Sequence, residues 1–190
     1  YFGICLIGTL LVLYLSIKYL SDLYNERGKL KDGTKSWDKV ILPIFFLTLL
    51  FVVPLIAGLD VGRFQWSHLG WPAFFIGLAC YVLSNVFIFW AMLVNKHFEG
   101  TVRIQTDRDH RVVYSGPYKF VRHPGYIGMI LWPLTFPLML GSVFTFIPAG
   151  VCVIAIIIRT ALEDRTLHNE LDGYRDYSEK VKYRLFPGLW

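Results

Sequence analysis

Charged residues are scarce in this chain: they make up 17% of 190 residues, against about 25% in soluble domains. Cysteine is also rare, and Cys5, Cys80 and Cys152 lie far apart without a CxxC pair, which excludes a disulfide framework and a thiolate metal site. The net charge of +5 would suggest nucleic-acid binding in a soluble protein, but long charge-free apolar runs exclude it. With 55% hydrophobic residues, the composition predicts an integral membrane protein that binds membrane lipid and no nucleic acid.

Several apolar runs are long enough to span a bilayer, which takes about 20 helical residues. Three of them cover residues 2–20, 40–59 and 69–94. Residues 126–158 carry no charge, and this run is too long for one span. Interior prolines each cost a helix about 3 kcal/mol, which disfavours a single long helix. We therefore expect a tight helical hairpin that turns near residues 140–143, with a first arm kinked or shortened by Pro133 and Pro137.

Basic residues are distributed unevenly between the apolar runs. Successive polar segments hold six, one, six, none and six Lys and Arg residues. By the positive-inside rule, this pattern predicts about five transmembrane helices with the C-terminus in the cytoplasm. The polar segments 95–125 and 159–190 then share the cytoplasmic side. We expect an all-α integral membrane protein that forms one domain over residues 1–190, in which the cytoplasmic loop and C-terminal helices build any pocket.

A first cluster of candidate functional residues lies directly before the predicted hairpin. Residues 116–126 read GPYKFVRHPGY, in which Pro117 and Pro124 restrict the backbone and aromatic residues flank Arg122 and His123. A rigid loop of this kind suits a ligand site. It also suits an interfacial anchor, because Tyr, Lys and Arg are enriched at membrane surfaces. Composition alone does not distinguish a ligand-binding loop from an interfacial anchor.

A second cluster follows the last apolar run. Arg159 and Glu163 are four residues apart, so on a helix they share a face where the last span leaves the bilayer. The pair suits an ordinary ion pair or a ligand site. An Arg at this depth is costly unless it pairs, reaches the interface or meets an anion, which favours the ligand site. The histidines show no HExxH or close pair, so no metal site is expected.

The two clusters and their order resemble a known family. GPYKFVRHPGY, an apolar hairpin, RTALED and GYRDYSEKVKYRLFP are similar to the isoprenylcysteine carboxyl methyltransferases and their prokaryotic relatives, in a superfamily that includes phospholipid N-methyltransferases. The resemblance covers about the last 95 residues. It implies a multi-pass enzyme of the prokaryotic plasma membrane. Its cytoplasmic pocket would bind S-adenosyl-L-methionine and release S-adenosyl-L-homocysteine.

The resemblance also implies roles for individual residues. Arg159 corresponds to the arginine that binds the substrate carboxylate, and both Arg159 and Glu163 would be catalytic. The positions implied for cofactor binding are His110, Val112, Val113, Tyr118, Arg122, His123, Pro124, Tyr126 and Glu163. The family motif HVLV is matched at 110–113 only in its first and last residues. An upstream glutamine of the family falls near Arg103 or Gln105.

The leading hypothesis is methyl transfer to the carboxylate of a lipid-like or prenylated acceptor that enters from the membrane. In this reaction the negative charge of the carboxylate and the positive charge of the sulfonium are both neutralised, so a site with little water that aligns the two reactants favours it. The reaction requires no metal. A phospholipid amine acceptor is an alternative, and it would need a base such as Glu163 or His123. A catalytically silent membrane scaffold is the alternative from another class. The sequence carries no signal for an oligomeric state.

Overall fold

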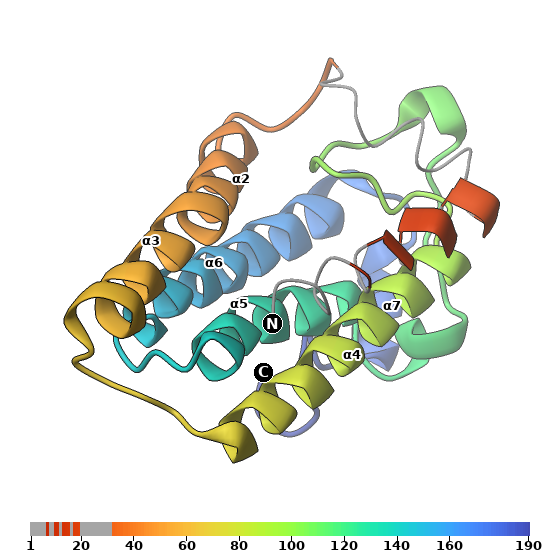
Figure 1. The fold of residues 1–190 in the computed structure, drawn as a ribbon. Coiled ribbons are helices and arrows are strands. Elements are labelled where there is room, and N and C mark those ends of the chain that lie inside the picture. Colours follow the sequence, from red (N-terminus) through yellow and green to blue (C-terminus); the bar gives the residue numbers. More distant parts are fainter. Residues whose placement is uncertain (1–6, 8–9, 12, 16, 20–31) are drawn as a thin grey trace.

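The computed structural model describes residues 7, 10–11, 13–15, 17–19 and 32–190, and every regular element within them is helical (Figure 1). The elements from residue 32 onward are α2 (Asp38–Leu47), η1 (Thr48–Val52), α3 (Val53–Ala57), η2 (Gly58–Phe64), α4 (Trp71–Val94), η3 (Thr106–Arg108), η4 (Gly116–Lys119), α5 (Pro124–Leu140), α6 (Phe146–Glu170) and α7 (Tyr174–Lys180). The first predicted span, 2–20, lies largely outside the described residues.

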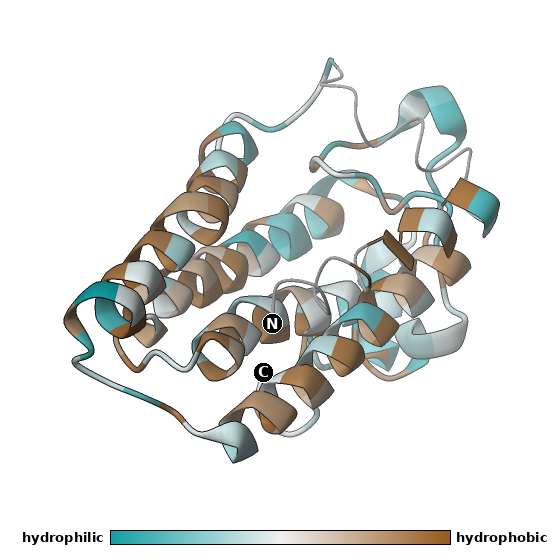
Figure 2. Ribbon diagram, in the orientation of Figure 1, coloured by the Kyte–Doolittle hydropathy of each residue, from teal (hydrophilic) through white to brown (hydrophobic). Residues whose placement is uncertain are grey.

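Three described helices are long and apolar enough to cross a membrane. The first is continuous from α2 to η2, over Asp38–Phe64, and the others are α4 and α6. The spans predicted at 40–59 and 69–94 are therefore confirmed. Figure 2 shows apolar residues along these helices and polar residues gathered in the loop before α5 and in the C-terminal part of α6. This distribution is that of an all-α membrane protein with one strongly polar end.

The predicted hairpin is formed by α5 and α6. Helix α5 ends at Leu140, and Gly141 follows with φ +76°, a left-handed conformation that favours glycine and stops the helix. Pro133 and Pro137 both lie inside α5, which has 17 residues and a length of about 26 Å. A bilayer core of about 30 Å is slightly thicker than this. The expected short first arm is thus confirmed.

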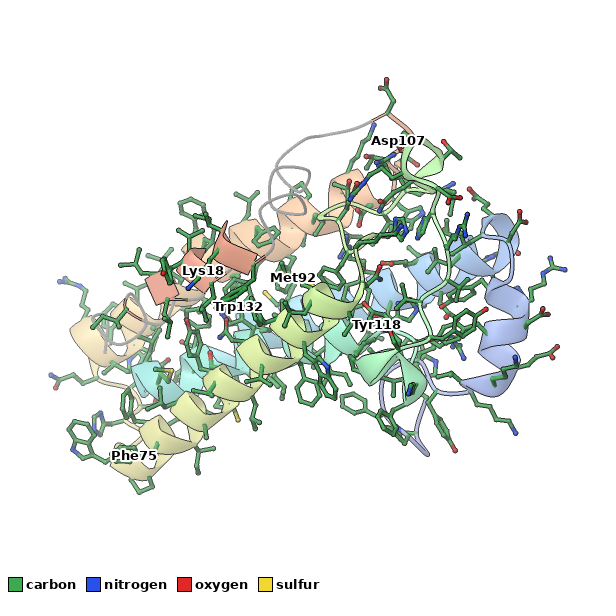
Figure 3. The ribbon with its side chains drawn as sticks, turned by 90° about the vertical axis from the view of Figure 1, so that its right-hand side faces the viewer. Lys18, Phe75, Met92, Asp107, Tyr118 and Trp132 are labelled. Atoms are coloured by element: carbon green, nitrogen blue, oxygen red, sulfur yellow. The ribbon has the colours of Figure 1, made fainter. Side chains whose placement is uncertain are left out.

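Helix α5 packs between α4 and α6, and α2 packs against α6 (Figure 1). One buried cluster joins the first described span, α5 and α6 to the C-terminal segment: Phe45, Leu49, Val53, Tyr126, Ile130, Cys152, Ile156 and Leu185. Because α6 continues to Glu170, its polar end reaches the loop 95–123. Figure 3 shows Tyr118 of this loop well away from Phe75, which lies near the far end of α4.

Candidate active site

A pocket lies at the polar end of the bundle, where the loop 95–123 meets α5, α6 and α7. Its lining includes all but one of the site residues predicted from the sequence: His110, Val112, Val113, Tyr118, Arg122, His123, Tyr126, Arg159 and Glu163. Pro124 is the exception, since it is buried as the first residue of α5 and does not line the pocket. The structure therefore brings the two sequence clusters together. Their binding roles stay predictions.

The start of α5 is shaped for a close approach of the loop. Pro124 occupies the first helical position, where its missing N–H has no partner to lose. At Gly125, which lines the pocket, a Cβ atom would lie 2.5 Å from Cε2 of Phe98. Glycine is thus required there for space rather than for an unusual backbone angle. The proline and glycine of RHPGY allow the loop to pack directly on the helix end.

Tyr126 connects the main candidate residues of the pocket. Its hydroxyl donates a hydrogen bond to Oε2 of Glu163. The Arg159 guanidinium carbon lies 5.2 Å from the centroid of the same ring, within the range of a cation–π contact. The His123 ring stacks on it at 5.7 Å, with 14° between the planes. One aromatic side chain therefore fixes the positions of a carboxylate, a guanidinium and an imidazole around the pocket.

Arg159 pairs with Asp38 of α2. Nε and Nη2 of Arg159 donate to the two carboxylate oxygens of Asp38 at 2.6 and 3.2 Å, and Nη2 also donates to the Gly100 carbonyl at 2.8 Å. Both side chains are buried, with 4% and 0% exposed. Asp38 also accepts the backbone N–H of Val102 at 2.7 Å. Arg159, for which the family resemblance implies contact with the acceptor, is thus held by a helix from the other half of the chain.

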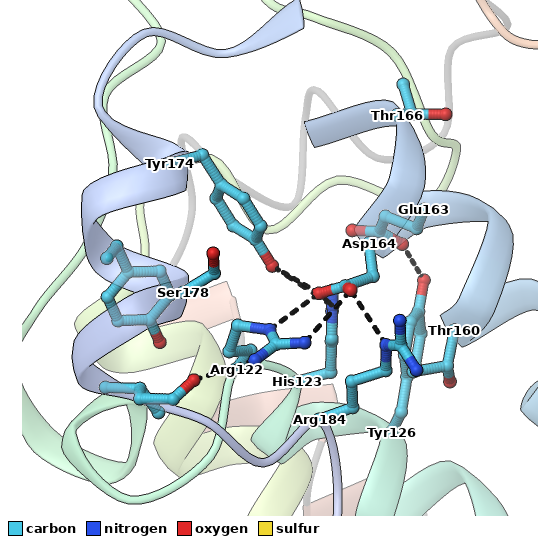
Figure 4. Close-up of polar contacts among 12 residues, drawn as sticks. Arg122, His123, Tyr126, Thr160, Glu163, Asp164, Thr166, Tyr174, Ser178 and Arg184 are labelled. Carbon is cyan, nitrogen blue, oxygen red and sulfur yellow. Dashed lines mark hydrogen bonds and ion pairs between the residues drawn. The ribbon is translucent and has the colours of Figure 1, made fainter. Parts of the chain in front are cut away.

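Asp164 is the centre of a second polar network, drawn in Figure 4. Its carboxylate accepts Nε and Nη2 of Arg122 at 2.7 and 3.0 Å and lies 3.1 Å from Nε2 of His123. The Tyr174 hydroxyl and Nε of Arg184 each donate to it at 2.8 Å. Burial and the adjacent Asp164 charge raise the pKa of Tyr174, which keeps the hydroxyl a donor. The network joins α6 to the loop, to α7 and to the C-terminal segment.

Arg122 and His123 therefore serve first as structural partners of Asp164. Nη1 of Arg122 also donates to the carbonyls of Val181 and Lys182, at 2.8 Å each. The backbone N–H groups of Arg122 and His123 donate to the carbonyls of Tyr183 and Arg184. Both side chains still form part of the pocket wall. Any contact of theirs with a cofactor would involve the surfaces that these bonds leave free.

Two histidine rings lie against each other in the pocket wall, tilted by 34°. The rings of His97 and His110 are 4.6 Å apart, and the Gln105 side chain donates to the His97 carbonyl at 2.7 Å. The Gln105 backbone N–H donates to Nδ1 of His110, which must therefore be unprotonated. Burial, together with the neighbouring His97, lowers the pKa of His110 to about 4. Both Gln105 and Arg103 line the pocket, but Arg103 is bound by Glu99 and Asp107.

Tyr118 forms another part of the wall. Asn95 donates an amide hydrogen to its hydroxyl at 3.2 Å, and the Tyr177 hydroxyl donates to its carbonyl at 2.7 Å. Burial raises the pKa of Tyr118, so the hydroxyl remains neutral and polar inside the pocket. The side chain is thereby fixed by groups from α7 and from the end of α4.

Sequence reasoning missed Asp38, Asp164 and His97 as parts of this site. Asp164 had a signal, because it follows Glu163 directly in RTALED. Asp38 had none, because it precedes the second span like an ordinary boundary residue, and 121 positions separate it from Arg159. His97 also resembled a boundary residue just after α4.

The model of the isoprenylcysteine carboxyl methyltransferase family matches residues 76–169, which run from α4 through the loop and the hairpin to the end of α6. These 94 of the 190 residues are therefore similar to that family. The match covers the loop residues of the pocket together with Arg159, Glu163 and Asp164. Asp38 lies outside it.

Several curated proteins that are similar to this chain are named methyltransferases. The chain is 30% identical over 158 residues to a protein-S-isoprenylcysteine O-methyltransferase of Schizosaccharomyces pombe, covering 80% of this chain and 59% of that protein. It is 23% identical over 119 residues to a probable protein-S-isoprenylcysteine O-methyltransferase of Oryza sativa subsp. indica, covering 58% and 60%. It is 31% identical over 116 residues to methanethiol S-methyltransferase 1 of Bradyrhizobium diazoefficiens, covering 60% and 38%. The chain thus spans three fifths or less of the length of these relatives.

Proposed function

We propose that this chain is a membrane methyltransferase that uses S-adenosyl-L-methionine to methylate the carboxylate of a lipid-like or prenylated acceptor. The observation that carries the proposal is the placement of buried Arg159 and half-buried Glu163 on one face of α6, where both line the same pocket at the polar end of an apolar bundle. A guanidinium suits an anionic acceptor, and a carboxylate suits a cationic methyl donor.

The groups around the pocket fit a sulfonium cofactor. Glu163 provides a negative charge for a cation or an amino group, and Tyr126 provides an aromatic face beside it. Tyr118, Asn95 and the His97 and His110 pair offer polar and flat surfaces for a nucleoside. These residues would hold the cofactor without a nucleotide-binding β-α-β fold.

When bound, S-adenosyl-L-methionine would supply the methyl group: a lone pair of the acceptor oxygen forms the new bond to the methyl carbon, and the electrons of the carbon–sulfur bond remain on sulfur. The residues of this chain would orient and enclose the reactants. Arg159 holds the acceptor carboxylate through a charge-assisted hydrogen bond, and Glu163 faces the positive end of the donor. The buried Tyr126 ring and the loop 95–123 would limit the access of water, which would strengthen these electrostatic contacts. No proton has to move, because a carboxylate attacks in its ionised form.

An amine acceptor makes different demands on the same pocket. Its protonated form must lose a proton before it can attack, and Arg159 would repel it. The two candidate bases are already engaged, since Glu163 accepts the Tyr126 hydroxyl and Nε2 of His123 faces Asp164. This arrangement favours the carboxylate acceptor.

We also infer that the pocket faces the cytoplasm. The loop 95–123 and the C-terminal residues 159–190 carry twelve of the 19 Lys and Arg residues, and the positive-inside rule assigns such segments to the cytoplasmic side. The acceptor would enter sideways from the membrane, since apolar helices flank the pocket.

The test uses the full chain purified in detergent. Calorimetric titration with S-adenosyl-L-homocysteine is expected to show binding at one site. Incubation with methyl-tritiated S-adenosyl-L-methionine and N-acetyl-S-farnesylcysteine is expected to give a product that releases labelled methanol in base, as a methyl ester does. Phosphatidylethanolamine and an alkanethiol serve as parallel acceptors. Base-stable label in either of these, with none in the carboxylate, would refute the carboxylate assignment. Absence of cofactor binding would favour the silent scaffold.

A further inference from the structure

The first described span contributes a distinct face to the pocket. Asp38, Leu42 and Phe46 of α2 are spaced four residues apart, so they lie one above another on one side of the helix. Leu42 and Phe46 line the pocket, and Asp38 binds the pocket residue Arg159. All three precede residue 76, where the family match begins. A part of the site therefore comes from outside the matched region.

The Asp38 contact determines which atoms of Arg159 face the pocket. The carboxylate takes up Nε and Nη2, and the Gly100 carbonyl takes a second hydrogen of Nη2. Within the described part of the chain, none of the hydrogen bonds of Arg159 uses Nη1. Among the described residues, every fully buried polar side-chain atom has a hydrogen-bond partner. Because Nη1 has none among these residues, it is not fully buried. Nη1 is thus the donor left for a ligand.

The apolar residues of the same face continue toward the membrane. Phe46 is 40% exposed on a helix whose neighbours Ile44 and Leu47 are exposed apolar side chains. Its contact with the pocket and its exposure place it where the pocket meets the lipid-facing surface. An acceptor with its anionic end at Nη1 of Arg159 would therefore extend its apolar chain past Leu42 and Phe46.

We propose that this face of α2 selects the acceptor. Asp38 is a positioning residue that fixes Arg159 with Nη1 toward the acceptor anion, and Leu42 and Phe46 contact the acceptor's apolar chain. The proposal rests on the proposed methyltransferase function and adds to it three residues of α2 that select the acceptor. A short water-soluble acceptor would leave the apolar part of the face uncovered.

The tail contact is tested with a matched pair of variants, Phe46→Ala and Phe51→Ala. Phe51 lies in the same span but is 65% exposed and does not line the pocket. The probes are N-acetyl-S-farnesylcysteine and its geranyl analogue, which is one isoprene unit shorter. We expect Phe46→Ala to reduce the preference for the longer probe, measured as a ratio of kcat/KM, by about 5- to 10-fold. Phe51→Ala should leave the ratio unchanged. Equal ratios in wild type and Phe46→Ala would overturn the tail contact.

The positioning role is tested with Asp38→Asn and Asp38→Glu, and with Asp32→Asn as the control on an exposed acid. We expect Asp38→Asn to raise the KM for the carboxylate probe about 10-fold or more while the affinity for S-adenosyl-L-homocysteine stays within about 2-fold of wild type. Asp38→Glu should restore part of the loss. If KM is unchanged, or if affinity for the two ligands falls together, Asp38 does not position Arg159 for the acceptor. If Asp38→Asn does not fold, the comparison of Phe46→Ala with Phe51→Ala decides whether the α2 face selects the acceptor.

Equilibrium binding separates this proposal from the proposed function. Calorimetry with the farnesyl and geranyl probes, in the presence of S-adenosyl-L-homocysteine, measures acceptor binding without turnover. Failure of wild type to bind S-adenosyl-L-homocysteine refutes the methyltransferase function. Binding of the cofactor and of both probes, with no effect of Phe46→Ala on the relative affinities of the probes, refutes only the role of the α2 face. Cofactor binding without binding of either probe also refutes the prenylated carboxylate as the acceptor.

Discussion

Asp164 holds Arg122 in a two-pronged ion pair, with Nε and Nη2 of the arginine 2.7 and 3.0 Å from the two carboxylate oxygens. The two residues are 42 positions apart, and both side chains are almost fully buried. The same carboxylate also binds Tyr174 and Arg184. A single acidic side chain thus fastens the loop, α7 and the C-terminal segment to α6.

We predict that Asp164→Ala destabilises the protein by about 3 to 5 kcal/mol, because it leaves the buried Arg122 charge without a partner. Thermal unfolding in detergent, followed by intrinsic fluorescence, measures the loss. Asp172→Ala, at an exposed position just beyond α6, is the control and should unfold like wild type. Similar unfolding of the two variants would show that the network contributes little to stability.

Glu163 is predicted to bind the cofactor. We expect Glu163→Ala to weaken S-adenosyl-L-homocysteine binding by about 1 to 3 kcal/mol, as for loss of a hydrogen bond to a charged group. Isothermal calorimetry gives the affinity, and Glu179→Ala on the exposed face of α7 is the matched control. An unchanged affinity in folded Glu163→Ala protein would mean that the family's cofactor role does not apply to this residue.

The helical hairpin was predictable because its signals are local. Prolines disfavour one long helix, and Gly141 marks the turn by the conformation it must adopt. The π-helical segments η1 and η2 within the first described span were not predictable. A change of helical hydrogen bonding depends on packing against neighbouring helices, and the hydropathy of the run does not record it.

The candidate site was predictable where charged residues follow apolar runs, as Arg159 and Glu163 do. The pattern of charged residues after apolar runs could not predict which residue pairs with Arg159. Asp38 joins it only through the packing of α2 on α6, a contact between distant parts of the chain. Likewise, Arg122 and His123 were predicted to bind cofactor, whereas their bonds to Asp164 depend on the folded loop.

The pKa of His110 leads to a prediction about pH. Burial and His97 lower it from 6.5 to about 4, so the folded protein keeps the ring neutral where the unfolded chain binds a proton. Stability should therefore fall as the pH decreases from about 6.5 toward 4 and should gain nothing from this group above that window. His110→Asn keeps an acceptor for the Gln105 N–H and should reduce the decrease in Tm between pH 6.5 and pH 5. The control His68→Asn, at an exposed position, should leave this decrease in Tm unchanged. An equal effect of both variants would contradict the assignment of the pH dependence to His110.

The orientation of the pocket is testable by labelling single cysteines introduced in a variant that lacks the native ones. We expect Lys119→Cys and Lys180→Cys to react with an impermeant maleimide only after the cells are opened, because both exposed positions belong to the polar end. Val143→Cys, in the turn between α5 and α6 at the other end, should react in intact cells. Labelling of Lys119→Cys and Lys180→Cys from opposite sides would refute a common cytoplasmic pocket.

Arg159→Lys distinguishes the acceptor types. Lysine keeps the charge but replaces a planar fork by a point charge, so it cannot bind Asp38 through two nitrogens and still direct a third at the acceptor. For a carboxylate acceptor, we expect kcat/KM to fall about 10- to 100-fold, as for loss of a hydrogen bond between charged groups.

The affinity of Arg159→Lys for S-adenosyl-L-homocysteine should change little, because Glu163 is the residue expected to contact the cofactor. An amine acceptor would tolerate the substitution, since its protonated form gains nothing from the guanidinium. Methylation of N-acetyl-S-farnesylcysteine and of phosphatidylethanolamine is therefore measured with the same variant, and Arg165→Lys, on an exposed part of α6, is the control. If cofactor binding and turnover are lost together, Arg159 acts mainly as the structural partner of Asp38, and the acceptor anion must be bound by another group.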